Sequence, residues 1–283
     1  MDAYEFDELF KALLNKFSFL QMHQRMASKV KDQVVAELKT QHDAISEFSQ
    51  EKKDLLGKSY NVYMFHNPFT GRLQPHSSTS HTLAERAREA HIHQNKICQL
   101  LLVDAFEAFE DYVVEVYELA ANVHSELRIK EDHQRQLSTE RLKKKSSDII
   151  RNFRAKIPAI AETEKNNKMA KDLRFYLFMI EKFRHIIVHR AGRCSNTGAL
   201  VEAILKNSCL LTDKARGPAA EEVIRRFIGT DTVEGVIILV EEQLLASPVR
   251  VSLNRHEELL HVLTGYALIL GRSLLEFDAA KNT

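Results

Sequence analysis

The sequence predicts a mainly α-helical fold, namely a helical bundle with long helices and one small β insertion before its last helix. Two observations lead to this prediction. Glycine and proline are scarce, with nine Gly and five Pro in 283 residues, whereas residues that favour helices are plentiful. Apolar residues also recur at helical spacing over most of the chain. The hydrophobic content of 44% can form a substantial core, and of the two arrangements that this length permits, one domain or two, we expect a single domain over residues 1–283.

Charge and cysteine content narrow the class of protein. The chain has 40 Lys and Arg against 39 Asp and Glu, so any contact with nucleic acid must come from local patches. Cys98, Cys194 and Cys209 show no metal-ligand spacing, and we expect free thiols in a reducing compartment. The start of the chain is acidic and no long uninterrupted apolar stretch follows. These features predict a cytoplasmic protein with no membrane partner.

The N-terminal part, residues 1–57, is predicted to form a helical arm. Apolar residues recur at helical spacing from Phe6 to Ile45, and the pattern closes at Gly57. One long helix or two would fit, lying along the body or forming a coiled-coil-like arm. Residues 58–81 collect Pro, Gly, Ser and Thr, so we expect a loop there.

The core helices are predicted within residues 82–192, beginning with a second long helix from about Thr82 to Val123. This helix carries a cluster of four acids, Asp104, Glu107, Glu110 and Asp111. A solvated surface explains such a cluster. The alternative is that one of the four acids faces a polar site on the helix at residues 173–192.

Residues 125–148 are charged and poor in apolar side chains, which predicts an exposed helix with a hinge. They include a basic run from Lys143 to Lys145. A solvated helix face explains this run better than a nucleic-acid patch does.

Residues 173–192, LRFYLFMIEKFRHIIVHRAG, form the helix around which the bundle is predicted to be organised. Apolar residues cover most of its circumference, so we expect packing on several sides. Its last turns carry Arg184, His185 and His189. Burying these groups would cost on the order of several kcal/mol unless they are paired or face a cleft. The two histidines share a helix face, and the long Arg184 side chain can reach toward it, so all three could meet one phosphate.

The last third of the chain changes character. Helical periodicity weakens over residues 193–254, where β-branched segments are punctuated by Gly235 and Pro248. This pattern predicts a small β-hairpin or three short strands, and we include the segment VEAILKNSCLL among them. Residues 255–278 return to a helical pattern whose apolar stripe should pack on the bundle.

Several patterns that resemble chemical sites fail on spacing. His256 and His261 are five residues apart, where two zinc ligands on one helix face need four. His91 and His93 are two apart and would point in roughly opposite directions on a helix. The chain has no glycine-rich phosphate loop and no nucleophile elbow. We therefore expect no metal and no cofactor.

The segment Arg184-His185-Ile186-Ile187-Val188-His189 resembles the HEPN superfamily. The features that carry the resemblance are an Arg followed by four to six residues and a His, a polar residue directly after the Arg, and a place on the penultimate long helix of an α bundle. The apolar helix and the break at Ala191 and Gly192 set this segment apart from other Arg and His pairs of similar spacing in the chain. The acidic and aromatic helix at residues 97–120 is similar to the second core helix of that superfamily, and the resemblance covers roughly residues 85–275.

The resemblance implies a metal-independent endoribonuclease that acts on RNA as a homodimer. Members of the superfamily are often toxins or antiviral defence effectors, so a cognate antitoxin or regulatory protein is an implied partner. In such a site Arg184 would stabilise the charge of the phosphorane, and His189 would act as base or acid. His185 would carry a second proton or orient the site.

Two other interpretations remain open from the sequence. Some members of the superfamily are non-catalytic, so the chain could be a dimeric RNA-binding or protein-binding module. Alternatively, Arg184 and His189 are satisfied structural groups, with Arg184 paired to an acid such as Glu110 and His189 at a helix end.

Overall fold

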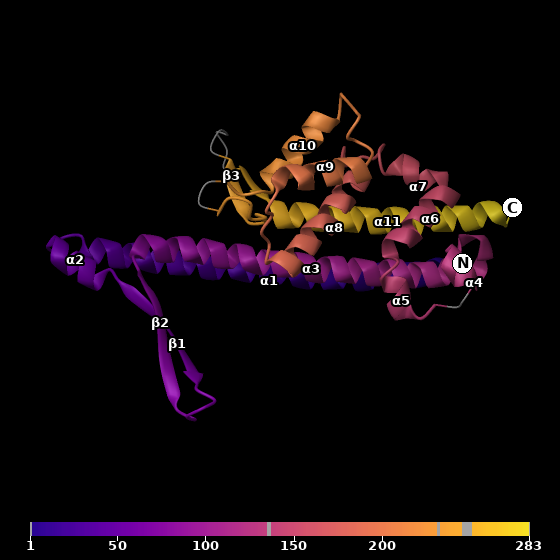
Figure 1. Cartoon of the computed structure of the whole chain (residues 1–283). Coiled ribbons are helices and arrows are strands. Elements are labelled where there is room, and N and C mark those ends of the chain that lie inside the picture. Colours follow the sequence, from indigo (N-terminus) through magenta and orange to yellow (C-terminus); the bar gives the residue numbers. More distant parts are fainter. Residues whose placement is uncertain (1, 135–136, 231–232, 245–250, 283) are drawn as a thin grey trace. The chain divides into compact units, whose positions relative to one another are not determined.

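A computed structural model describes residues 2–134, 137–230, 233–244 and 251–282, and its helices form the expected mainly α-helical bundle (Figure 1). Its helices are α1 (Ala3–Ile45), α2 (Gln50–Leu56), α3 (Leu83–Val123), the 3-10 turn η1 (Ser125–Leu127), α4 (Lys130–Gln134), α5 (Thr139–Lys143), α6 (Ser146–Lys156), α7 (Pro158–Thr163), α8 (Leu173–Arg190), α9 (Thr197–Asn207), α10 (Gly217–Arg226) and α11 (Arg255–Lys281). Its strands are β1 (Ser59–His66), β2 (Leu73–His81), β3 (Glu241–Leu244) and β4 (Val251–Asn254). The predicted fold class is confirmed.

The chain divides into two compact units. The larger unit joins residues 1–22 to residues 98–283, and the smaller unit holds residues 23–97. The predicted boundaries at residues 57, 192 and 254 do not coincide with the limits of these units. They stay a prediction, as does the single domain. The candidate site lies in the larger unit.

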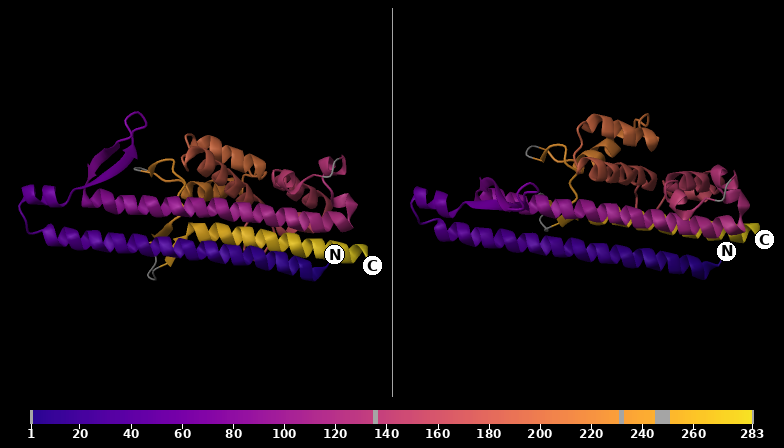
Figure 2. Two further views of the ribbon diagram at one scale, coloured as in Figure 1. Left: turned by 90° about the horizontal axis from the view of Figure 1, so that it is seen from below. Right: turned by 60° about the horizontal axis from the view of Figure 1, so that its bottom comes forward.

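The larger unit is built on α11, α3 and the first part of α1, which run side by side in the left view of Figure 2. Tyr112 of α3 marks the place where the three helices meet. Its ring packs edge-on against Phe10, with 6.3 Å between ring centroids, and its hydroxyl donates to the Ala267 carbonyl at 3.0 Å. Gly271 of α11 lies directly against the Tyr112 hydroxyl, because a Cβ there would come within 3.1 Å of that oxygen.

A second layer of shorter helices covers this core. Helix α8 packs against both α9 and α11, and α6 and α7 pack against each other (Figure 1). The Phe183 ring of α8 meets the Phe227 ring after α10 at 5.6 Å between centroids. Both rings are fully buried, so this contact closes the layer around the inner face of α8.

The smaller unit corrects the prediction of a loop at residues 58–81. Strand β1 pairs with β2 in an antiparallel hairpin, from Ser59 opposite His81 to His66 opposite Leu73. The connecting turn is fixed by Asn67, whose side-chain oxygen accepts from the Phe69 N–H at 2.8 Å. The aromatic and β-branched residues of β1 favour a strand. The Ser and Thr of the partner strand led the sequence interpretation to a loop.

Two further segments differ from expectation. Residues 125–148 form η1, α4, α5 and the start of α6, so the single exposed helix with a hinge is wrong. Leu127 and Leu142 are buried there. Each anchors a short helical segment, and because the segments are separate, the sequence shows no continuous helical periodicity. The segment VEAILKNSCLL is mostly α9, whose start is capped by Asn196 accepting from the Ala199 N–H at 2.9 Å.

The predicted hairpin before the last helix is confirmed. Strands β3 and β4 pair antiparallel, from Glu241 opposite Asn254 to Leu244 opposite Val251. Gly235 adopts a left-handed φ of 70° in the irregular stretch before them, while Pro248 lies outside the described residues. Among those residues, α11 alone is long and apolar enough to cross a membrane, and 56% of its apolar window is buried inside the protein. A core helix has this property too.

Candidate functional site

The helix that carries the predicted site has well-defined ends. Asp172 caps the start of α8 by accepting from the Phe175 N–H at 3.0 Å. The helix ends at Ala191, which adopts a left-handed φ of 51°. Gly192 follows with φ of 80°, and a Cβ on it would lie 2.5 Å from Nε2 of Gln99 on α3. The break that the sequence shows at Ala191 and Gly192 is therefore a left-handed turn in which Gly192 lies against the Gln99 side chain, and glycine suits both the positive φ and the close contact.

The outer face of α8 is more open than the sequence predicted. Its inner face is buried from Leu173 to Ile187, but His185, Val188 and His189 are exposed. Helix α8 packs against α9 and α11, in line with the expected packing on several sides, but this outer face is left open. Apolar residues such as Val188 lie on this face without another element packing over them. The apolar composition of a helix therefore overstates how much of it is buried.

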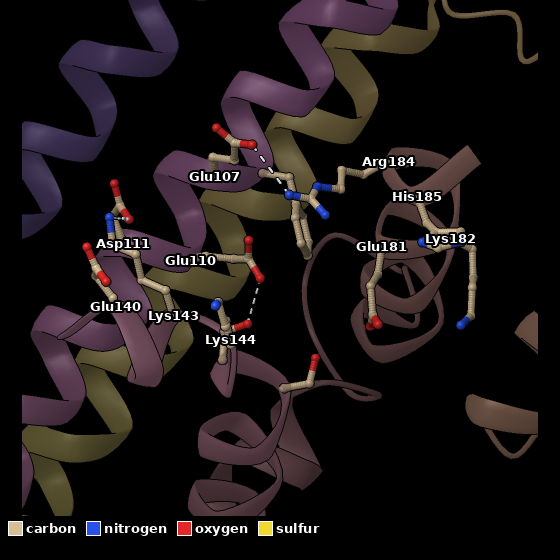
Figure 3. A pocket seen from close by; sticks show the side chains of 13 residues that line it. Glu107, Glu110, Asp111, Glu140, Lys143, Lys144, Glu181, Lys182, Arg184 and His185 are labelled. Carbon is tan, nitrogen blue, oxygen red and sulfur yellow. Dashed lines mark hydrogen bonds and ion pairs between the residues drawn. The ribbon is translucent and has the colours of Figure 1, made fainter. Parts of the chain in front are cut away.

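A cleft of about 700 Å³ opens beside the last turns of α8 (Figure 3). Helix α3 supplies one wall, α8 the opposite wall, and α5 with the start of α6 closes one end. Its lining residues are Phe106, Glu107, Glu110, Asp111, Glu140, Lys143, Lys144, Ser146, Ser147, Glu181, Lys182, Arg184 and His185. Of the predicted site residues, Arg184 and His185 line the cleft. His189 lies one turn further along α8, on its exposed face.

Arg184 reaches across the cleft to α3. Its Nη2 donates to Oε1 of Glu107 at 3.4 Å, and the guanidinium and carboxylate approach each other in Figure 3. The Nε atom of Arg184 is buried without a hydrogen-bond partner among the described residues. An acid of the 104–111 cluster therefore does face Arg184. It is Glu107, and not the Glu110 that the structural alternative named.

Glu110 has a different environment in the same wall. It accepts a hydrogen bond from the Ser146 hydroxyl at 2.7 Å. Desolvation raises the pKa of Glu110, and the Ser146 hydrogen bond and the Arg184 charge only partly oppose that shift. Asp104, the first of the four acids, is exposed and does not line the cleft.

His185 and His189 form a ring pair. Their centroids lie 4.6 Å apart with the planes tilted by 52°. Desolvation lowers the pKa of His185, and the nearby positive charges of His189, Lys182, Arg190 and Arg184 lower it further. A neutral His185 can accept a proton at neutral pH.

The basic run from Lys143 to Lys145 is partly a solvated ion-pair surface. Lys143 pairs with Asp111 at 2.5 Å and Lys145 with Glu131 at 2.9 Å. Lys144 and Lys182 line the cleft, and neither has an ionic partner in the part of the chain that the structure describes. Two cations without an ionic partner among the described residues thus lie beside Arg184, in a cleft that the carboxylates of Glu140 and Glu181 also line. The sequence interpretation placed Lys144 in a solvated basic run and did not name Lys182, because a free lysine looks the same in the sequence as a paired one.

No family supplies an independent assignment. Comparison with protein families, curated proteins and solved structures finds no match for this chain. The geometry of the cleft therefore has to carry the functional argument.

Proposed function

We propose that this protein is a metal-independent endoribonuclease of the HEPN type, with Arg184, His185 and His189 as its reacting groups. The observation that carries the proposal is the combination at the end of α8. The accessible imidazoles of His185 and His189 lie 4.6 Å apart. The Arg184 side chain, on the adjacent face of α8, lines the cleft of about 700 Å³. Imidazoles and a guanidinium are the groups that cleavage by the 2′-hydroxyl of RNA requires.

In this mechanism a base removes the proton of the 2′-hydroxyl, whose oxygen attacks the adjacent phosphorus. The bond to the 5′-oxygen breaks, an acid protonates that oxygen, and a 2′,3′-cyclic phosphate remains. His185 suits the base, because its lowered pKa keeps it neutral. His189 is the second proton carrier. Arg184, with Lys144 and Lys182 nearby, balances the charge of the phosphorane.

The geometry also supports a homodimer. In-line displacement places the entering and leaving oxygens on opposite sides of phosphorus, whereas the adjacent rings of His185 and His189 share one side of one helix. A two-fold dimer would supply a second set from the opposite side. Exposed apolar residues on α1, such as Met22, Met26 and Val30, repeat every four residues and suit a helix-to-helix contact.

The decisive experiment follows RNA cleavage in EDTA. The wild-type protein should cut RNA and leave a 2′,3′-cyclic phosphate, while His189→Ala should not. His261→Ala is the matched control, because His261 is an exposed histidine on α11. The rate should rise as the pH rises through the lowered pKa of His185 and fall again as the acid loses its proton. A substrate with a single 2′-deoxy nucleotide at the cut must resist cleavage; cutting it, or a need for magnesium, refutes the proposal.

The runner-up is a non-catalytic dimeric module that binds RNA or protein. The ion pair between Arg184 and Glu107 favours the protein-binding form of this module, since an engaged arginine is less available to a phosphate. Glu107→Ala separates the two candidates. In an enzyme, Glu107→Ala frees Arg184 and should preserve or raise the cleavage rate. In a binding module neither the wild-type protein nor Glu107→Ala cleaves RNA.

A further inference from the structure

The hairpin of β1 and β2 carries an unusual set of uncovered aromatic side chains. Tyr63 is 68% exposed and Phe65 38%, and Phe69 at the turn is 95% exposed. Tyr63 and Phe65 lie on one face with nearly parallel rings, 12° apart in tilt and 6.4 Å apart in centroid position. A contiguous apolar surface of this kind marks an interaction site.

The partner strand adds polar groups to the same face. In the register of the hairpin, His76 lies opposite Tyr63 and Gln74 lies opposite Phe65. Facing residues of an antiparallel pair share a side of the sheet. The face therefore combines the rings of Tyr63 and Phe65 with the imidazole of His76 and the amide of Gln74, whose oxygen already accepts from the Asn67 side chain at 3.1 Å.

The charge of the hairpin is of one sign. Residues 58–81 contain no Asp or Glu, although 28% of the whole chain is charged. Lys58 and Arg72 stand at the base and at the turn, and both side chains are exposed. No ionic partner for either is found in the described part of the chain. A surface with flat rings and unopposed cations is complementary to a polyanion that carries flat bases.

Other occupants fit these observations less well. A lipid bilayer would have to cover His76 together with the aromatic rings, and burying a polar side chain without a partner is unfavourable. A second copy of the hairpin would bring Lys58 and Arg72 against the same cations.

We propose that the β1–β2 hairpin binds single-stranded nucleic acid, with Tyr63, Phe65 and Phe69 stacking on bases. Lys58 and Arg72 contact the backbone phosphates. This site does not depend on the proposed ribonuclease, because stacking requires no cleavage and DNA bases present the same faces as RNA bases.

The test measures binding of a labelled single-stranded DNA of about 12 nucleotides, a length within the usual site size, to the full-length protein by fluorescence anisotropy. DNA has no 2′-hydroxyl, so a failure of the ribonuclease proposal leaves this measurement unaffected. Replacing Tyr63, Phe65 and Phe69 together by Ser should weaken binding about tenfold or more. Tyr4→Ser is the control, because Tyr4 is an exposed tyrosine on α1.

Charge reversal gives a second, independent arm. Arg72→Glu should weaken binding and reduce its dependence on salt, whereas Lys39→Glu, at an exposed lysine of α1, should do neither. Thermal melts of all variants establish that they are folded. The proposal is overturned if the wild-type protein does not bind the oligonucleotide, or if the triple variant binds it equally well. It is also overturned if the triple variant instead loses binding to phosphatidylglycerol vesicles or loses self-association while its DNA affinity is unchanged.

Discussion

Two arginine–glutamate pairs lie near the same cleft and differ in almost every physical respect. Arg154 donates from Nε to Glu164 at 2.7 Å, and the side chains are 18% and 0% exposed. Arg184 donates to Glu107 at 3.4 Å, with side chains 31% and 56% exposed. The first pair is enclosed and short, whereas the second is open and long. The same residue types therefore form an enclosed contact in one place and an open, solvent-accessible contact in the other.

The enclosed pair belongs to a small network. Glu164 also accepts a hydrogen bond from the hydroxyl of Tyr266, which is fully buried on α11. Burial and the nearby Glu164 charge raise the pKa of Tyr266 far above its usual range, so the hydroxyl stays a donor. The network borders a chamber of about 140 Å³ that shares Phe106 and Glu110 with the larger cleft. It holds α6, α7 and α11 together behind the candidate site.

The largest expected difference between the two arginine–glutamate pairs is the loss of stability when Arg154 is removed. Arg154→Ala should lower the free energy of unfolding by about 3–5 kcal/mol, because it leaves the Glu164 carboxylate buried without its cation. Urea unfolding measures the change. The double variant Arg154→Leu with Glu164→Leu should recover only part of the loss, because no buried charge remains but the buried Tyr266 hydroxyl loses its acceptor. A small effect of Arg154→Ala alone would mean that this pair is as open as the pair at Arg184.

The histidines show the same contrast between an enclosed and an open environment, since His185 and His189 are exposed and His256 is not. His256 on α11 is fully buried, and neither ring nitrogen has a hydrogen-bond partner in the described part of the chain. Burial lowers the pKa of His256 to about 4, against roughly 6.5 in the unfolded chain. Between these values the unfolded chain binds more protons, so the stability present above pH ~6.5 is lost as the pH falls toward 4. The loss should be about 3 kcal/mol at pH ~4, from 1.36 kcal/mol per pKa unit.

Unfolding measured across this pH range checks the prediction. His256→Leu should flatten the acid dependence that the wild type shows, because the apolar residue has no proton to bind. His261→Leu, at an exposed histidine on the same helix, should leave it unchanged. Equal slopes for the wild type and His256→Leu would show that other groups control the acid sensitivity.

Substitutions in the turn at Gly192, which ends α8, should have an intermediate effect on the free energy of unfolding. Gly192→Ala should cost about 2 kcal/mol, since the left-handed φ of 80° is strained for alanine and the new Cβ would press on Gln99. Gly198→Ala is the matched control. Its Cβ would meet only the Asn196 side chain, at an ordinary 3.5 Å, so it should be neutral or stabilising. Gln99→Ala added to Gly192→Ala should relieve the contact but not the strain.

The sequence predicted the elements whose signal is local. Long apolar periods located α1, α3, α8 and α11, and the glycine after α8 marked its end. Burial of individual polar groups could not be predicted in the same way. The sequence interpretation required Arg184, His185 and His189 to be paired or to face a cleft. Arg184 and His185 do line the cleft and His189 is exposed, while the buried groups are Glu164 and His256, whose burial was not predicted. Whether a polar residue is covered depends on which helix crosses over it, and no periodicity within its own helix contains that information.

The smallest effect on stability, and the largest on function, is expected at the exposed pair. Arg184→Ala and His189→Ala should change the free energy of unfolding by no more than about 1 kcal/mol, because solvent screens the ion pair with Glu107 and His189 is exposed. If α8 carries a catalytic site, both variants lose cleavage while their melting curves overlay the wild type. If Arg184 is instead a structural group like Arg154, its loss lowers the melting temperature markedly and Glu107→Ala has a similar effect. Melting curves and cleavage assays on the same preparations decide this, and a destabilised Arg184→Ala would assign both arginines to structure.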